Sequence, residues 1–187
     1  MRLPTHLAII MDGNGRWAEQ HNKPRSYGHI KGTRVAKTII QECARIGIKH
    51  LTLYAFSTEN WLRPKSEVSI LMKLLRKYLR RETKNLIKEN IRFESIGDHS
   101  QLPTDILEAL DYTQKATRHC TGMTLVFALS YGSRQEVTTA VRKMAELIEH
   151  GSLRAKDIST ETISAFLQTR EMPDPDLIIR TSGERRL

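Results

Sequence analysis

HLAIIMDGNGRWA, residues 6–18, joins a short apolar run to a turn that contains two glycines. The run Leu7–Met11 has the length and composition of a buried strand, and Asp12 ends it. Glycines that lead into a helix allow backbone N–H groups to surround an anion, helped by the positive end of the helix dipole. Arg16, in the same turn, can add bidentate contacts to phosphate oxygens. The segment therefore predicts a strand, an anion-binding turn and a helix.

The rest of the chain repeats this alternation of apolar runs and helical patterns. Four further runs are predicted strands: Leu51–Phe56, Ile91–Ile96, Met123–Leu129 and Leu177–Ile179. Helical patterns predict helices at about 31–46, 67–89, 104–117, 134–149 and 160–168. The alternation indicates an α/β fold, with a mostly parallel central sheet flanked by helices on both faces. At 187 residues, without a long linker or repeat, the chain suits a single domain, residues 1–187.

Polar loops rich in arginine follow the predicted strands. The carboxyl ends of parallel strands lie along one edge of a sheet, and ligands bind in the crevice there. The loops after the second and last strands contribute Arg63, Arg180 and Arg186, and Arg25 lies beyond the first turn. This positive charge predicts a site for two polyanionic ligands, or for one extended ligand.

Asp12 would be repelled by phosphate groups unless a cation stood between them. Mg²⁺ takes oxygen ligands and is commonly held by one or two carboxylates together with substrate phosphates. A metal between Asp12 and a diphosphate would stabilise the charge that develops as diphosphate departs. The alternative, in which Asp12 only caps a helix, does not explain the arginines around it. Asp12 is therefore a candidate Mg²⁺ ligand.

Two familiar classes of nucleotide-binding protein are excluded. Gly13, Gly15 and Ala18 have the GxGxxA spacing of a dinucleotide-binding turn. That fold places an acidic residue about 20 positions further on, at the end of the second strand. Here the first acid after the second strand is Glu59, much further along the chain. The chain also lacks the GxxxxGK[ST] motif, so it is not a P-loop protein.

The composition indicates an anionic partner and a reducing compartment. The net charge is +9 and the isoelectric point is about 9.8, which suits nucleic acid, phosphorylated molecules or an anionic lipid surface. The densest basic run, Arg76–Arg81, is interpreted as a solvated helix face, and the few aromatic residues form no visible platform for nucleic acid. Cys43 and Cys120 form no metal-ligand spacing and are predicted core thiols. No apolar run approaches the length of a membrane span, and a signal peptide is not expected, so the predicted location is cytoplasmic.

Several motifs together resemble one family. HLAIIMDGNGRWA is followed in order by GH at Gly28, LTLYAFSTENWLRP, and LIIRTSGE near the end of the chain. This pattern resembles the cis-prenyltransferase (isoprenyl transferase) family, and within it the bacterial undecaprenyl diphosphate synthases. The resemblance covers nearly the whole chain. It implies a helix-flanked parallel sheet, usually a homodimer, and Mg²⁺-dependent condensation of isopentenyl diphosphate onto an allylic diphosphate with new double bonds in cis.

The resemblance also assigns roles to individual residues. Asp12 matches the family's metal-handling aspartate, and Asn60 matches the position usually given the proton-accepting role. Because a neutral amide is a poor base, Asn60 is better suited to position water or a diphosphate oxygen that takes the proton. The implied substrate-binding residues are Gly13, Asn14, Gly15, Arg16, Trp17, Arg25, His29, Ser57, Thr58, Glu59, Trp61, Arg63, Arg180 and Arg186.

The resemblance makes a long-chain polyprenyl diphosphate the expected product, such as the precursor of a lipid carrier for cell-wall glycan synthesis. Farnesyl diphosphate is the expected starter, and the apolar faces of helices 31–46 and 67–89 are candidate walls for the product. A peripheral association with the membrane follows from that product, and nucleic acid is not an expected partner. The family continues beyond the position of Leu187, so the chain is expected to lack the family's C-terminal segment. The alternative is a non-catalytic relative that acts as a subunit, although the intact DGNGR turn argues against it.

Overall fold

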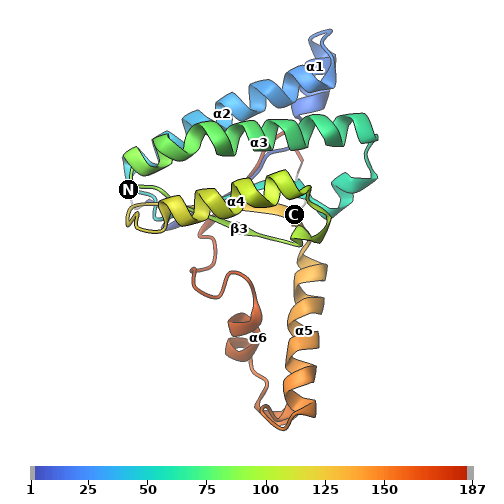
Figure 1. Cartoon of the computed structure of the whole chain (residues 1–187), viewed down its shortest axis with the longest axis vertical. Helices are drawn as coiled ribbons and strands as arrows, with labels where there is room; N and C mark the ends of the chain where they lie inside the picture. The colour runs from blue at the N-terminus through green and yellow to red at the C-terminus, as the bar shows by residue number, and fades with distance from the viewer. Residues whose placement is uncertain (1–2, 185–187) are drawn as a thin grey trace.

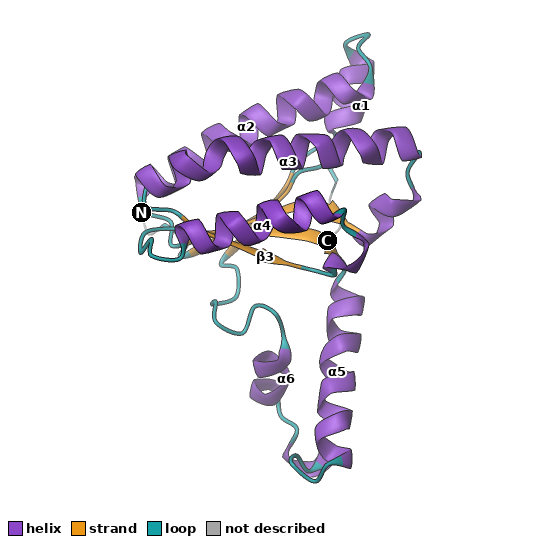
Figure 2. Cartoon of the chain, viewed as in Figure 1, coloured by secondary structure: helices purple, strands orange, loops and turns teal. Residues whose placement is uncertain are grey.

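The predicted strands form one sheet in the computed structural model, which describes residues 3–184 (Figures 1 and 2). All strand pairs in it are parallel, and the spatial order is β3-β4-β2-β1-β5. The strands are β1 (His6–Ile10), β2 (His50–Ser57), β3 (Arg92–Ile96), β4 (Thr124–Tyr131) and β5 (Leu177–Arg180). Each agrees with its predicted range to within about two residues, so the parallel α/β prediction is confirmed.

β1 lies between β2 and β5, and this position determines where the first turn emerges. The register aligns Ile10 of β1 with Tyr54 of β2 on one side and with Arg180 of β5 on the other. Two strands that are more than 160 residues apart in sequence therefore end side by side. The turn after β1 meets the loop after β5 at the carboxyl edge of the sheet, as the topology of parallel sheets requires.

Three long helices cover one face of the sheet. They are α2 (Arg25–Ile46), α3 (Lys65–Lys88) and α4 (Thr104–Thr117), which lie beside one another over the strands (Figure 2). The core between these layers includes Leu51 and Leu53 of β2, Phe93 of β3 and Leu79 of α3, all almost completely buried. These are the apolar positions that gave the helical and strand patterns in the sequence.

The first part of the chain is more helical than predicted. α1 (Asn14–Gln20) begins directly after Gly13, and α2 begins at Arg25, six residues before the predicted start at 31. Glycines at 28 and 32 weakened the helical pattern, because glycine inside a helix is normally unfavourable. In the structure a side chain at either position would collide with Asn14, so these glycines allow α1 to pack closely on α2.

Gly28→Ala is expected to destabilise the protein by about 1–3 kcal/mol, the usual cost of overpacking. The new Cβ would lie 1.8 Å from the carbonyl oxygen of Asn14, and a backbone atom cannot move away as a flexible side chain can. Urea unfolding measures the effect. Val35→Ala, at an exposed position of the same helix, is the control and should change stability much less. Equal stability of the two variants would contradict the close packing of α1 on α2.

The remaining helices form an arm rather than a second layer. α5 (Ser133–Glu149) leaves the carboxyl edge of the sheet, and α6 (Thr160–Phe166) runs back beside it, both projecting away from α2–α4 (Figure 1). On the second face Val126 and Ala128 are buried, and Met172 packs against their cluster. Helices therefore flank the sheet as predicted, but in residues 3–184 the long covering helices lie on one face only.

Candidate active site

The turn after β1 is tied to the loop after β5 by Thr181. The hydroxyl of Thr181 accepts the backbone N–H of Asp12 at 2.9 Å and donates to the carbonyl of Asp12 at 2.6 Å. The backbone N–H of Thr181 donates to the carbonyl of Ile10 at 3.2 Å, which continues the strand pairing. These contacts hold Asp12 at the carboxyl edge of the sheet.

The carboxylate of Asp12 is bound by two arginines from opposite ends of the chain. Arg16 Nη2 donates to Oδ1 and Arg180 Nη2 donates to Oδ2, each at 3.0 Å, and the Gly13 N–H donates to Oδ1 at 2.6 Å. Burial by itself would raise the pKa of Asp12, but these hydrogen bonds and the charge of Arg16 lower it below its usual value. Asp12 is therefore ionised at neutral pH.

Gly13 allows the turn to pass against the loop after β5. Its φ is +87°, in the region that favours glycine, and a Cβ there would lie 2.5 Å from the hydroxyl of Ser182. Arg16, one turn further on, donates through Nη1 to Glu184 at 3.0 Å as well as to Asp12. The two loops are thus linked by side chains on both sides of Asp12.

A second group of cations surrounds Glu67, near the start of α3. Arg63 Nη1 donates to Glu67 Oε1 at 2.9 Å, His29 Nε2 lies 3.0 Å from the same oxygen, and Arg25 Nε donates to Oε2 at 3.2 Å. Only 13% of the Glu67 side chain is exposed. Burial would raise the pKa of Glu67, but hydrogen bonds from His29 and Arg25, with the charges of Arg25 and Arg63, lower it. Since an ionised carboxylate only accepts, His29 donates through Nε2–H.

His29 is held as a neutral donor in this group. Burial lowers its pKa, and the positive charges of Arg63 and Arg25 act in the same direction, while Glu67 only partly opposes them. A neutral imidazole with its Nε2–H committed to Glu67 is fixed in orientation. The sequence indicated His29 but assigned no role to Glu67, the carboxylate that orients it.

The groups around Asp12 and Glu67 meet at Gly15. A Cβ at Gly15 would lie 2.6 Å from the guanidinium carbon of Arg25, so this guanidinium rests directly on the turn that carries Arg16. We refer to Arg16, Arg25, His29, Arg63 and Arg180 together as the basic site. The structure therefore brings together five of the predicted substrate-binding side chains around the carboxylates of Asp12 and Glu67. Arg16 pairs in addition with Glu184, and Arg25 with Glu19.

Other predicted residues have structural contacts. Trp17 stacks on Tyr27 with ring centroids 6.3 Å apart, which fastens α1 to α2. The indole N–H of Trp61 donates to Ser130 Oγ at 2.9 Å, and the ring packs edge-on against Phe56. Both aromatic rings thus anchor their turns, and their roles in substrate binding stay predictions.

The turn η1 (Thr58–Leu62) follows β2 and carries the remaining predicted residues. Asn60 Oδ1 accepts the backbone N–H of Ser57 at 3.2 Å, which closes the turn on itself. The Thr58 hydroxyl is buried. Glu59 is exposed, and the pKa of its carboxyl is lowered by hydrogen bonds from its own backbone N–H and from Ser57. The roles of these residues in substrate binding stay predictions, and Arg186 lies outside the described residues.

Four residues of the site were not predicted individually: Glu67, Thr181, Ser182 and Glu184. The last three follow β5 and become neighbours of Asp12 only because β5 pairs with β1. Glu67 was visible in sequence as an acid four residues after Arg63, the spacing that allows a helix ion pair. Its contacts with Arg25 and His29 depend on how α2 and α3 pack.

The donor atoms near Asp12 suit a metal that is shared with a substrate. Within residues 3–184, no three His, Cys, Asp or Glu side chains form a group that could hold a metal ion. Asp12 supplies a single carboxylate, and arginines occupy its other neighbouring positions. Such a donor set fits Mg²⁺ that takes most of its ligands from phosphates and water, rather than a permanently bound ion.

A parallel α/β sheet with one carboxylate and a set of arginines at its carboxyl edge defines a class of enzymes that act on phosphorylated substrates. The family model described as "Putative undecaprenyl diphosphate synthase" matches residues 10–187, and the chain belongs to this prenyltransferase family.

Curated relatives and a solved structure agree with this membership. The chain is 50% identical to an isoprenyl transferase of Geobacter sulfurreducens, over 100% of this chain and 76% of the relative. It is 48% identical to a Micrococcus luteus ditrans,polycis-undecaprenyl-diphosphate synthase described as (2E,6E)-farnesyl-diphosphate specific, over 100% of this chain and 75% of the relative. The crystal structure of lavandulyl diphosphate synthase from Lavandula x intermedia, in complex with dimethylallyl diphosphate, superposes with a TM-score of 0.95 at 38% identity, over 98% of this chain and 79% of that one.

Proposed function

We propose that this enzyme condenses isopentenyl diphosphate onto an allylic diphosphate, with farnesyl diphosphate as the starter, and forms cis double bonds in a long-chain polyprenyl diphosphate. The observation that carries the proposal is the binding of Asp12 by Arg16 and Arg180, which come from the turn after β1 and the end of β5. Asp12 would serve as the protein ligand of Mg²⁺, which would offset the negative charge of the headgroups that Arg16 and Arg180 bind. The names of the relatives support the same reaction and a product of the undecaprenyl type.

We assign one diphosphate substrate to the residues that follow β1 and the other to the residues at the end of β5. The turn Gly13–Trp17, with Arg25 and His29, would hold the allylic diphosphate, since the guanidinium of Arg25 already lies on Gly15. Arg180 would hold the isopentenyl diphosphate, together with Arg186. Guanidinium groups at fixed positions bind diphosphate oxygens in pairs and stabilise the negative charge of the departing diphosphate.

Mg²⁺ would supply electrophilic activation of the leaving diphosphate, with Asp12 as its protein ligand. Asp12 also holds Arg16 and Arg180 until phosphate oxygens take over those guanidinium groups. The protein thus orients both headgroups around one carboxylate, and no general acid is required for the diphosphate to leave.

Asn60 is proposed to orient a proton acceptor rather than to accept the proton. Its carbonyl oxygen is already engaged by the backbone N–H of Ser57, which leaves the amide N–H₂ to donate. A donating amide can hold a water molecule or a diphosphate oxygen near the carbon that loses its proton. This geometry supports the assignment made from the sequence.

The apolar chain is proposed to lie between α2 and α3, above the sheet. Ile39 of α2 and Val68, Leu71 and Leu75 of α3 pack against the core but are only partly buried. Apolar side chains that stay accessible between two helices can line a path for an isoprenoid tail. Those helix faces were the candidate walls in the sequence.

The arm supports the proposed homodimer. Val137 and Val141, one turn apart on α5, are each about half exposed, at 48% and 52%. Neighbouring exposed apolar residues on a projecting helix favour burial against another chain.

No helix within residues 3–184 has both the length and the apolar character needed to cross a bilayer. We propose that the enzyme associates peripherally with the membrane, because its product is a lipid.

The test is incorporation of radiolabelled isopentenyl diphosphate by the purified protein with farnesyl diphosphate, with Mg²⁺ or with EDTA. We expect long-chain product with Mg²⁺ and essentially none with EDTA, and reversed-phase chromatography gives the chain length. A short ten-carbon product made from dimethylallyl diphosphate would instead favour the lavandulyl type of reaction. Folded protein that makes neither product would overturn the proposal and favour a non-catalytic subunit.

A further inference from the structure

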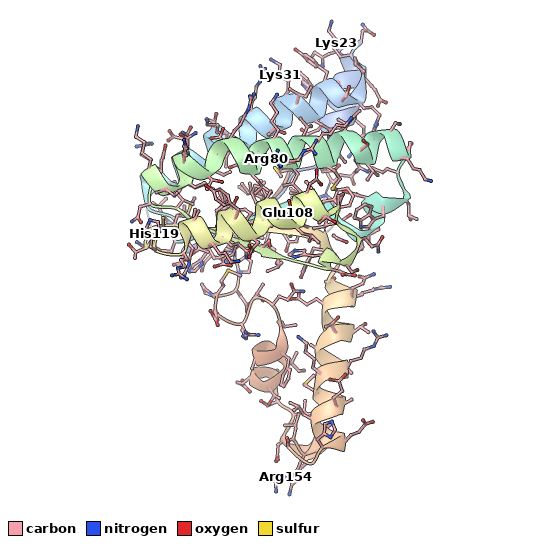
Figure 3. All side chains as sticks on the ribbon, in the orientation of Figure 1. Lys23, Lys31, Arg80, Glu108, His119 and Arg154 are labelled. Carbon is pink, nitrogen blue, oxygen red and sulfur yellow. The ribbon has the colours of Figure 1, made fainter. Side chains whose placement is uncertain are left out.

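The positive charge of the chain is concentrated on two neighbouring helices. α2 and α3 together contain 13 Lys and Arg residues but three Asp and Glu residues, while the whole chain has a net charge of +9. The rest of the chain is therefore close to neutral. The two helices form the outer layer over one face of the sheet, where Lys31 and Arg80 mark α2 and α3 (Figure 3).

α3 carries most of this charge in one stripe, which we call the α3 stripe. At 100° per residue its six members lie within about 100° of one another around the helix axis. They are Lys73, Lys77, Arg80, Arg81, Lys84 and Lys88, all exposed. From the first to the last, the stripe is about 22 Å long, at 1.5 Å per residue.

Among the described residues, the acidic residues of α3 form no ion pair with the stripe. Glu67 and Glu82 point toward α2, where Glu82 pairs with Lys37 at 2.8 Å and Glu67 binds Arg25 and His29. Among residues 3–184, the ion pairs include none that involves the six cations of the stripe. The basic run Arg76–Arg81, which the sequence suggested was merely a solvated face, contributes Lys77, Arg80 and Arg81 to this longer unpaired stripe, while Arg76 pairs with Asp105 of α4.

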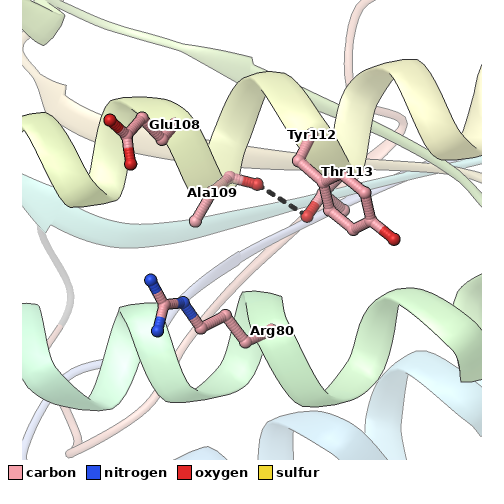
Figure 4. Close-up of a pocket in the computed structure, with 5 residues that line it drawn as sticks. All are labelled: Arg80, Glu108, Ala109, Tyr112 and Thr113. Atoms are coloured by element: carbon pink, nitrogen blue, oxygen red, sulfur yellow. Dashed lines mark hydrogen bonds between the residues drawn. The ribbon is translucent and has the colours of Figure 1, made fainter.

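On the side of α4, the α3 stripe is bordered by acidic residues. Between α3 and α4 is a shallow cavity of about 230 Å³, with Arg80 on one side and Glu108 and Tyr112 on the other (Figure 4). α4 also carries Asp105, which pairs with Arg76, and Asp111, which pairs with Lys115. An anionic partner would therefore approach from the side of α3 and α2 rather than from the side of α4.

The shape of the α3 stripe favours an extended anionic surface. A small anion needs donors that converge on one point, whereas these cations are spread along a straight helix. Single-stranded nucleic acid uses exposed aromatic rings for stacking, but Tyr78, the aromatic residue of α3, is buried. Ile87, at the margin of the stripe and 37% exposed, can contact the apolar part of a lipid surface.

We propose that the α3 stripe docks this protein on anionic phospholipid bilayers, with the axis of α3 along the membrane surface. Clusters of four to eight Lys and Arg residues on an amphipathic helix bind anionic lipid headgroups in this way. The choice of a bilayer rests on the proposed function, because a long polyprenyl product has to pass into a lipid phase. Docking by α3 keeps the enzyme beside that phase.

The test is sedimentation of the purified protein with vesicles of phosphatidylcholine alone, or of phosphatidylcholine with phosphatidylglycerol. We expect binding to the anionic vesicles only, weakened by salt. The variant Lys77→Gln/Arg81→Gln/Lys84→Gln should lower the partition coefficient on the order of 100-fold, as expected for three lost headgroup contacts. In detergent the same variant should retain prenyl transfer.

A matched variant shows whether the position of the positive charges, rather than their number, determines binding to vesicles. Arg142→Gln/Lys143→Gln/Lys156→Gln removes the same charge from exposed positions on the arm and should bind vesicles nearly as well as the unmodified protein. Equal loss in both variants, equal binding to neutral vesicles, or tighter binding to RNA than to anionic vesicles would overturn the proposal. Vesicle binding by protein that makes no polyprenyl product would overturn the proposed function and leave the docking surface standing.

Discussion

Asp12→Asn is expected to lower kcat by about 10²–10³-fold, the usual effect of removing one electrostatic group from a reacting centre. The amide has the size of the carboxylate but not its charge, so it is a poor ligand for Mg²⁺ at the departing diphosphate. Binding of inorganic diphosphate without metal should be unchanged or stronger, because Arg16 and Arg180 are no longer held by a carboxylate. Steady-state kinetics and isothermal titration calorimetry measure the two effects.

Asp98→Asn is the matched control for Asp12→Asn. Asp98 also follows a strand at the carboxyl edge of the sheet, but its carboxylate accepts the backbone N–H of Ser100 at 2.9 Å and forms no ion pair with an arginine among the described residues. Its variant should keep kcat close to that of the unmodified protein. If Asp12→Asn lost diphosphate binding while remaining folded, the role of Asp12 would be to shape the site rather than to handle the metal.

The central strands β2 and β4 could be predicted from sequence because most of their residues are buried. Such strands appear as short continuous apolar runs, and β4 (Thr124–Tyr131) is buried at six consecutive positions. Helix starts were harder to predict, as α2 shows. Gly28 and Gly32 look like a break in the helical pattern of the sequence. They are tolerated because Asn14 packs against them, a contact that is visible only in the structure.

The site could be predicted where its residues follow strands, but not where helices bring them together. Arg16 and Arg180 were predicted from the rule that parallel strands end at one edge, and they do bind the same carboxylate. Glu67 lies in an ordinary helical segment, so its sequence position gives no sign that Arg25 and His29 converge on it. The indole of Trp61, whose contact with substrate stays a prediction, is hydrogen-bonded to Ser130, a partner from another strand that the sequence could not indicate.

Glu67→Gln is expected to lower kcat/KM for the allylic substrate on the order of 10–100-fold, with a loss of about 1.5–3 kcal/mol in stability, the range for hydrogen bonds to charged groups. An amide oxygen could still accept from His29 and Arg63, but the N–H₂ group would then face Arg25, which is also a donor. Arg25 would then keep only Glu19 as an ion-pair partner, and we expect its guanidinium to shift away from Gly15 toward that residue. Steady-state kinetics and urea unfolding give the two quantities.

Glu82→Gln distinguishes positioning of the basic site from general helix packing. Glu82 lies on the same helix, is 16% exposed and joins α3 to α2 through Lys37, far along α3 from Glu67. Its replacement should reduce stability by a similar amount and leave kcat/KM nearly unchanged, because no group of the basic site depends on it. If both variants lost activity in proportion to their stability, Glu67 would be a packing residue. If only Glu67→Gln lost activity at temperatures where both are folded, then its carboxylate sets the positions of Arg25, His29 and Arg63 for substrate binding.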